Sequence, residues 1–401
     1  MNNLKRRAIA DDLRGLSRLS VDATRGIADL IEAMHHNIAR IPGTTPSKED
    51  GRTTGVSAMV YRAVHGVTQV VGTSIDSALA VLAPYLGSMA DRPEREHIQS
   101  AVNGLLGDHL VSSGNPLAIR MQIRKTGVVL ALDREALSNA LPEASGRILL
   151  LVHGLCMNDR QWSRTRSDGT NHDHGLALQK AHGYTPVYLH YNTGLSIADN
   201  GRLLSEQLDA LVEAWPVEVE DLSILAHSMG GLVTRSAHQH AEKAGHAWQR
   251  LAAKFIFLGT PHHGAPLERG GHWFDLILGS APFAAPFAKI GKIRSAGITD
   301  LRHGGISAEG IGLPPLPEGV ECFAVAGTTG PQGNMLRNKI LGDGLVPVES
   351  ALGLHDNPQH DLYFPAENRI IAHAANHMQL LSDEAVYAAL EKILKPVAAA
   401  T

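Results

Sequence analysis

The chain has 401 residues, of which 44% are hydrophobic and 19% are charged. This composition is ordinary for a globular chain that buries a sizeable core, and it excludes wholesale disorder, collagen and coiled coil. The 36 basic and 40 acidic residues give a net charge of −4, which leaves no broad basic field to hold a phosphate backbone. We therefore expect no nucleic-acid partner.

Two cysteines, Cys156 and Cys322, cannot form a disulfide framework or a four-thiolate zinc site. The first residues include basic side chains but lack the apolar core of a secretory signal. No apolar run reaches the roughly 18 residues that a transmembrane helix needs. We expect a cytoplasmic protein, and secretion after removal of a signal stays open.

Residues 1–112 show the apolar spacing of helices. Apolar side chains recur every three or four residues at 27–38, 56–82 and 98–110. In the second of these stretches Arg62 is the only Lys or Arg, whereas a helix at a membrane interface normally has several on its polar face. We therefore expect an N-terminal helical region at 1–112 that packs on the rest of the protein or on a second copy of the chain, as a homo-oligomer.

From residue 113 onward, short apolar runs alternate with helical patterns. Two runs separated by Lys-Thr-Gly, 119–124 and 128–132, predict a β-hairpin. Six further runs predict strands at 147–154, 185–191, 222–228, 254–259, 321–327 and 368–373. Helical patterns occur at 197–215, 229–243 and 382–395. The alternation predicts an α/β domain over 113–401, with a mostly parallel sheet covered by helices on both faces.

An insertion at about 260–316 interrupts this alternation. It holds one of the four tryptophans and three of the seven phenylalanines of the chain, namely Trp273, Phe274, Phe283 and Phe287. Large apolar side chains in a surface insertion either pack on the body or contact a ligand. We expect these four to form a lid or the wall of an acyl-binding pocket, with plain packing as the alternative.

The run Ala226-His227-Ser228-Met229-Gly230 lies where a predicted strand meets a predicted helix. A nucleophile elbow has this setting, because its serine occupies a strained turn whose neighbours at −2 and +2 must be small. Ala226 and Gly230 meet that condition. We therefore predict that Ser228 is a nucleophile, and the alternative is a serine that only caps the helix.

A reacting serine also needs N–H groups that stabilise the oxyanion. In a hydrolase of this architecture, one donor is the residue after the nucleophile, here Met229, and the other follows an earlier strand. The run Leu151-Val-His153-Gly154-Leu155 ends such a strand, so Leu155 is the second predicted donor. The alternative is that His153-Gly154 is only a turn.

A serine nucleophile needs a base, and the base needs an acid that orients it. In this architecture the chain order is serine, acid, histidine. Asp343 lies between two glycines after one predicted strand, and His377 lies in the loop after the last strand. We predict that Asp343 is the acid and His377 the base. The alternative base is His373, and the alternative acids are Glu349, Asp356 and Asp361.

Two histidine-rich loops are candidates for a structural zinc site, His172-Asp173-His174 and His262-His263. No tight or helical spacing defines such a site, so we predict no metal and no organic cofactor. Cys156 lies beside the predicted oxyanion loop. We expect a buried thiol there rather than a second nucleophile, because no partner histidine is indicated.

Five runs occur in a fixed order between residues 117 and 401: VHGL, AHSMGG, LGTPHHGAP, GDGLVP and NHMQLL. Together they resemble the α/β-hydrolase lipases and esterases, and most of all bacterial relatives of the GPI-inositol deacylases. The run AHSMGG is also similar to the elbow of small bacterial lipases. The resemblance implies an α/β-hydrolase fold and the same roles for Ser228, Asp343, His377, Leu155 and Met229. Residues 1–112 have no counterpart in the small lipases.

The function that these residues predict is a serine carboxylic-ester hydrolase, an esterase or lipase acting on apolar acyl esters through an acyl-enzyme. Its partner would be a small-molecule or lipid-like ester substrate. An acyltransferase or an amidase can use the same triad, and both stay open as alternatives. A non-catalytic interaction protein is the alternative from a different class, and the complete order of serine, aspartate and histidine argues against it.

Overall fold

The computed structural model describes residues 93–112, 114–166, 168–264, 295–304, 314–331 and 342–396. In this part of the chain, all strands belong to the larger of two compact units. The smaller unit contains helix α5 (Pro93–Ser112), which covers the helix predicted at 98–110. The two other predicted N-terminal helices, and most of the predicted lid, lie outside the described residues.

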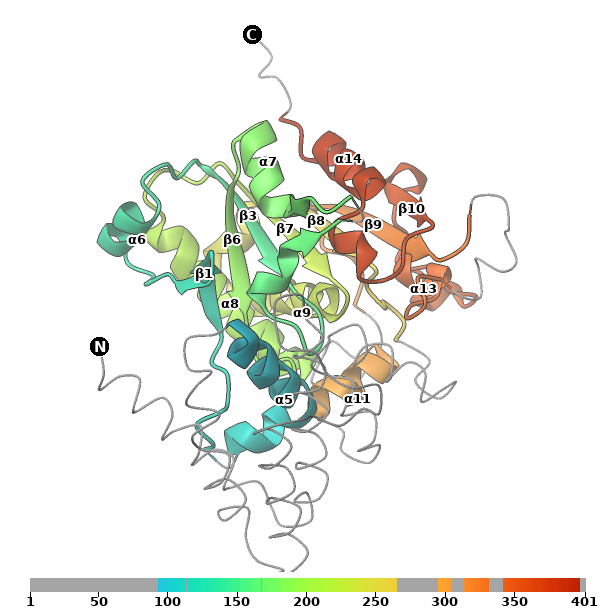
Figure 1. Ribbon diagram of the computed structural model, residues 1–401, viewed down its shortest axis with the longest axis horizontal. Helices are drawn as coiled ribbons and strands as arrows, with labels where there is room; N and C mark the ends of the chain where they lie inside the picture. Colours follow the sequence, from blue (N-terminus) through green and yellow to red (C-terminus); the bar gives the residue numbers. More distant parts are fainter. Residues whose placement is uncertain are drawn as a thin grey trace, which may run out of the picture. The chain divides into compact units, whose positions relative to one another are not determined.

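A mostly parallel sheet forms the centre of the larger unit (Figure 1). Its strands are β1 (Gln122–Lys125), β2 (Val128–Val129), β3 (Arg147–Val152), β6 (Thr185–His190), β7 (Asp221–His227), β8 (Ala252–Leu258), β9 (Glu321–Thr328) and β10 (Arg369–His373). The order across the sheet is β10-β9-β8-β7-β3-β6-β1-β2. The pairs from β6 to β10 are parallel, and β1 pairs antiparallel with both β6 and β2. This arrangement confirms the predicted class of sheet.

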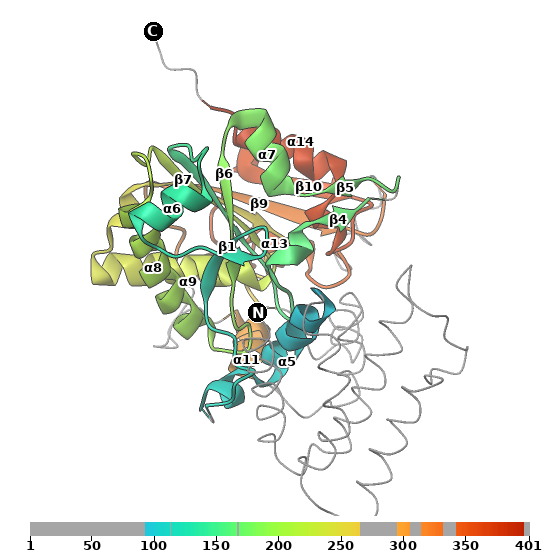
Figure 2. The same cartoon turned by 60° about the vertical axis from the view of Figure 1, so that its left-hand side comes forward.

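The helices of the larger unit lie on both faces of the sheet. Their bounds are α6 (Arg134–Ala140), α7 (His174–His182), α8 (Ile197–Ala214), α9 (Met229–Ala244), α11 (Ala296–His303), α13 (Val348–Ala351) and α14 (Glu384–Ile393). Short 3-10 helices are η2 (Asp159–Trp162), η3 (Ala247–Arg250), η6 (Pro358–His360), η7 (Ala366–Asn368) and η8 (Gln379–Leu381). Helices α7 and α14 cover one face of the sheet, and α8 and α9 cover the other (Figures 1 and 2).

Strand alternation explains how one sheet packs against two helical layers. Leu149, Leu151 and Leu225 belong to one buried cluster, which includes Leu178 of α7 and Leu390 of α14. Because successive side chains of a strand point to opposite faces, the residues between them are buried toward the other layer. Burial on both faces explains why these strands are continuous apolar runs rather than alternating ones.

Two sequence predictions differ from the structure. The hairpin is shorter than expected, because its strands are only Gln122–Lys125 and Val128–Val129 around the turn residues Thr126 and Gly127. The prediction that His172-Asp173-His174 is a loop was wrong. Asn171–His172 form strand β5, which pairs with β4 (Arg164–Thr165), and His174 begins α7. The side chain of Asp173 accepts a hydrogen bond from Leu176 N–H and so caps this helix.

Within the described residues, every helix is too short or too polar to cross a bilayer.

We predict that Leu225→Ala lowers the free energy of unfolding by about 2–5 kcal/mol, because it removes a fully buried side chain from the central strand. The matched control is Leu176→Ala in α7, whose side chain is 44% exposed. That change should stay within about 0.5 kcal/mol. Denaturant unfolding followed by circular dichroism measures both, and equal losses would contradict the proposed core.

Candidate active site

Ser228 lies in a strained turn between strand β7 and helix α9. Its backbone has φ 55° and ψ −127°, a conformation that costs a non-glycine residue on the order of 1–3 kcal/mol. The neighbouring strand β8 and its loop hold this turn. Ser228 N–H donates to Leu258 O at 2.8 Å, and Thr260 Oγ1 donates to Ser228 O at 3.0 Å. One main-chain hydrogen bond and one hydrogen bond from a threonine side chain therefore hold the strained turn in place.

The Ser228 hydroxyl is not used to cap the helix. Ser228 stands at the N-cap position of α9, but its side chain makes no capping hydrogen bond. The hydroxyl lies against the loop after β3, since a Cβ atom placed on Gly154 would lie 3.4 Å from Ser228 Oγ. The alternative, a serine that only caps the helix, requires a capping hydrogen bond that Ser228 does not make.

The two predicted oxyanion donors belong to the segments that meet at Ser228. Met229 is the first residue of α9, so its N–H has no acceptor within the helix, and the helix N-terminus favours negative charge. Leu155 follows Gly154 in a tight turn that Met157 N–H closes on Gly154 O at 3.3 Å. Cys156 has φ 60° in this turn.

Asp343 and His377 form a buried pair. His377 Nδ1 and Asp343 Oδ2 are 2.7 Å apart, and His377 N–H donates to Asp343 O at 3.0 Å. The second carboxylate oxygen, Oδ1, accepts from Leu345 N–H at 2.9 Å and Val346 N–H at 2.8 Å. Three donors thus satisfy a carboxylate that is fully buried. With the hydrogen on Nδ1, His377 Nε2 holds the lone pair that can accept a proton.

The parallel sheet brings the loops of the three predicted triad residues to one edge. Ser228 follows β7, Asp343 follows β9 and His377 follows β10. Because the carboxyl ends of parallel strands lie at one edge of a sheet, the three loops share that edge. Gly259, directly after β8, leaves room for the Asp343–His377 pair. A Cβ atom at this position would lie 3.0 Å from both Asp343 Oδ2 and His377 Nδ1.

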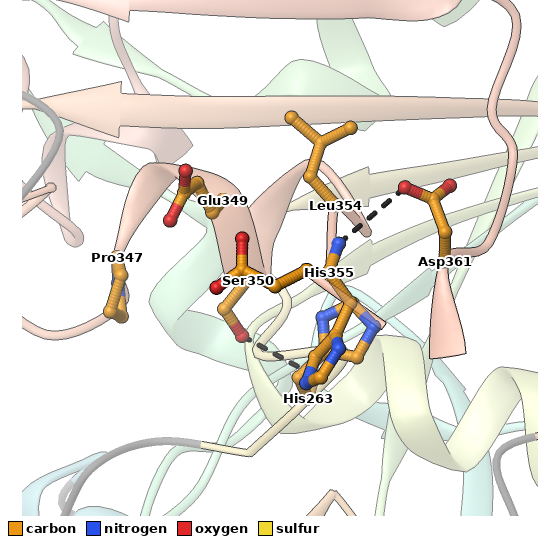
Figure 3. A pocket seen from close by; sticks show the side chains of 8 residues that line it. His263, Pro347, Glu349, Ser350, Leu354, His355 and Asp361 are labelled. Carbon is orange, nitrogen blue, oxygen red and sulfur yellow. Dashed lines mark hydrogen bonds between the residues drawn. The ribbon is translucent and has the colours of Figure 1, made fainter. Parts of the chain in front are cut away.

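The alternative base and acids lie elsewhere. His373 is exposed at the end of β10. The alternative acids Glu349, Asp356 and Asp361 line a separate polar pocket of ≈ 360 Å³, together with His263 and His355 (Figure 3). This lining includes neither Ser228 nor His377.

Two buried histidines lie next to the candidate triad. Burial lowers the pKa of His153 to about 3, so this ring is neutral near pH 7. It stacks on Tyr191 at 4.5 Å between ring centroids, and Tyr191 OH donates to His153 O at 2.8 Å. His227, which is not among the residues predicted from the sequence, has its ring centroid 4.6 Å from that of His377. Its position beside Ser228 was the one available signal.

In the two histidine-rich segments, ring nitrogens of His172, His174 and His263 make hydrogen bonds. His172 Nε2 lies 2.8 Å from His174 Nδ1, and His174 Nε2 contacts Leu380 O at 3.0 Å. His263 Nε2 donates to His360 O at 2.7 Å. Within the described ranges, no group of three or more His, Cys, Asp and Glu side chains is arranged to hold a metal ion.

The thiol of Cys156 is buried, as expected. Burial raises its pKa to about 12, so the reactive thiolate is almost absent at neutral pH.

Residues 143–285 match the model of a family described as a PGAP1-like alpha/beta domain. This stretch of the chain resembles that domain. It includes Ser228 and both predicted oxyanion donors, and it ends before Asp343 and His377. The sheet order and the strained turn at Ser228, together with this match, confirm the α/β-hydrolase fold.

Several solved structures are also similar. The mature lipase BlEst2 of Bacillus licheniformis is 18% identical with a TM-score of 0.42, and the alignment covers 62% of this chain and 92% of that one. The metagenomic carboxyl esterase MGS0156 is 17% identical with a TM-score of 0.36, covering 62% and 75%. Lipase B of Aspergillus fumigatus is 13% identical with a TM-score of 0.36, covering 95% and 83%. No curated protein is significantly similar in sequence.

We predict that Gly259→Ala disrupts the Asp343–His377 pair. The matched control is Gly183→Ala, because both glycines have positive φ, 58° and 71°, and a Cβ atom at Gly183 would meet nothing within 4 Å. Both variants should lose roughly 1–2 kcal/mol of stability from the left-handed backbone. We expect only Gly259→Ala to slow the reaction of Ser228 with a fluorophosphonate, by at least about tenfold. Equal labelling rates in the two variants would mean that the pair does not depend on this contact.

Proposed function

We propose that this chain is a serine carboxylic-ester hydrolase, an esterase or lipase. The observation that carries the proposal is the buried hydrogen bond between His377 Nδ1 and Asp343 Oδ2, at the same sheet edge as the strained serine. A structural serine needs neither the strained backbone nor a histidine oriented by a buried carboxylate. The family match supports the fold on which this chemistry is common.

In the proposed reaction, Ser228 Oγ attacks the ester carbonyl carbon while His377 Nε2 takes the hydroxyl proton. The tetrahedral oxyanion accepts hydrogen bonds from the N–H groups of Leu155 and Met229. His377 then gives the proton to the leaving alcohol, and the acyl group stays on Ser228. A water molecule, deprotonated by His377, then attacks the acyl carbonyl carbon. His377 returns the proton to Ser228 Oγ as the acyl–oxygen bond breaks, which releases the carboxylic acid and free Ser228.

The role of Asp343 follows from its surroundings. It holds the Nδ1–H tautomer of His377 and stabilises the imidazolium that forms when Nε2 takes a proton. Both side chains are buried, and a charge interaction is stronger where water is excluded. The N–H groups of Leu345 and Val346 keep the carboxylate satisfied before the imidazolium exists, so the site needs little rearrangement during the reaction.

An apolar acyl substrate is the finer part of the proposal. It rests on the aromatic residues Trp273, Phe274, Phe283 and Phe287, which lie outside the described residues. Four such side chains in one insertion are suited to contact an acyl chain.

We predict that Ser228→Ala abolishes hydrolysis of p-nitrophenyl esters and labelling by a fluorophosphonate while the protein stays folded. Loss of a triad nucleophile costs on the order of 10⁶ in rate in a related mechanism. Circular dichroism checks the fold. Turnover within about tenfold of the parent would rule out Ser228 as the nucleophile. A parent protein that neither reacts with the probe nor hydrolyses any ester would favour the non-catalytic alternative.

We predict further that replacing Trp273 and Phe274 by alanine slows turnover of octanoyl esters far more than of acetyl esters. Each buried methylene contributes roughly 0.8 kcal/mol, so an acyl-binding wall matters most for long chains. The measurement is kcat/KM over a p-nitrophenyl series from acetate to longer chains. Equal losses for both esters, with a lowered melting temperature, would show that these rings only support the fold.

The same assays separate the other candidate activities. An acyltransferase would pass the acyl group to an added alcohol in preference to water, and an amidase would cleave an anilide as readily as an ester. Product analysis in water with added alcohol distinguishes the first from a hydrolase, and a matched pair of ester and anilide substrates distinguishes the second.

A further inference from the structure

His227 connects the strand of the nucleophile to the loop of the base. It is the last residue of β7, directly before Ser228, and its side chain is fully buried. Its Nε2 lies 3.1 Å from the carbonyl oxygen of His377, and the two ring centroids are 4.6 Å apart. The residue directly before the proposed nucleophile therefore contacts the proposed base, which is 150 positions further along the chain.

With this contact, His377 is held at three separate atoms. Its Nδ1 bonds Asp343 Oδ2 at 2.7 Å, and its N–H bonds Asp343 O at 3.0 Å. Both of these bonds come from the acid loop. The bond from His227 to the carbonyl oxygen is the one of the three that comes from the nucleophile strand. This bond therefore fixes the position of the base relative to the nucleophile strand, whereas the other two bonds fix it relative to the acid loop.

The tautomer of His227 follows from its neighbours. A carbonyl oxygen accepts only, so Nε2 must carry the hydrogen and Nδ1 must be bare. Burial, and then electrostatic repulsion from His377 and Arg164, hold the pKa of His227 well below its usual value. The ring of Trp162 approaches it edge-on at 6.4 Å between centroids. His227 is therefore a neutral donor at any pH at which the base works, and it adds no charge beside the imidazolium.

We infer that His227 is a positioning residue that sets the His377 imidazole relative to Ser228, through its hydrogen bond to the His377 carbonyl and its ring contact. This inference rests on the proposed function. Proton transfer requires the base within hydrogen-bond reach of the serine. An error of about 1 Å in such a geometry costs on the order of 100-fold in rate. Loss of the donor should therefore lower kcat and leave substrate binding unchanged.

Two substitutions separate the hydrogen bond from the packing. His227→Phe keeps a planar ring and removes the donor. His227→Gln removes the ring but keeps an amide N–H the same number of bonds from Cβ as Nε2. The control is His238→Phe in α9, another buried histidine whose ring contacts Trp248 and Phe255 rather than the triad.

The rates are measured with p-nitrophenyl acetate, per active site titrated with a fluorophosphonate. We expect His227→Phe to lower kcat by about 10- to 100-fold with KM changed less than about twofold. The decrease in log kcat should be smaller for His227→Gln than for His227→Phe by at least about a third of the His227→Phe decrease. His238→Phe should keep the parent kcat.

A kcat for His227→Phe within about twofold of the parent, or a Gln variant no better than the Phe variant, would overturn the positioning role. If His227→Phe does not fold, the comparison of the Gln variant with His227→Leu decides by the same criterion.

A parent protein without ester turnover would instead contradict the proposed function. The downfield NMR resonance of the His377 Nδ1 proton would still test the positioning role in that case. It should shift or broaden in His227→Phe and stay unchanged in His238→Phe, and an unchanged resonance in both would overturn the inference.

Discussion

The close approach of helix α9 to strand β3 is the constraint on which the candidate site depends. A Cβ atom on Gly230 would lie 2.6 Å from Val152 O and 2.8 Å from His153 O, which is closer than real Cβ atoms come. A side chain there would push the helix away from the strand. It would also separate the turn of Ser228 from the loop of Gly154 and Leu155. Ser228 lies between this strand and helix with a strained backbone, and hydrogen bonds with β8 and with the loop after it hold that backbone.

A second requirement is that buried polar groups be satisfied, because an unpaired buried charge is very costly. Asp343 meets this requirement with two main-chain donors and His377. Its loop therefore provides a stable buried carboxylate rather than an exposed one. The Asp343 carboxylate also orients the His377 ring, so the hydrogen bonds that stabilise the acid loop hold the base in its orientation as well. His227, in the nucleophile strand, is a second buried polar side chain that contacts the base, because its Nε2–H donates to the main-chain carbonyl of His377.

Much of the fold was predictable because buried parallel strands are continuous apolar runs with helical patterns between them. The runs at 222–228 and 321–327 are strands β7 and β9 almost to the residue. The segment His172-Asp173-His174 is harder to predict, because its two histidines suggest metal ligands in a loop, whereas Asp173 caps helix α7. After β9, the two flanking glycines favour Asp343 as the acid, but Glu349, Asp356 and Asp361 also follow that strand. Only the tertiary structure places those three in another pocket.

The sequence by itself determined the α/β class, the order of the strands along the chain and the position of Ser228 between a strand and a helix, because these depend on local apolar periodicity and on small residues at adjacent positions. Only the tertiary structure decided which acid meets which histidine, and that His227 contacts the base. These contacts join residues that are 34 and 150 positions apart. They depend on the order of strands across the sheet and on loop conformations, and neither leaves a periodic signal in the chain.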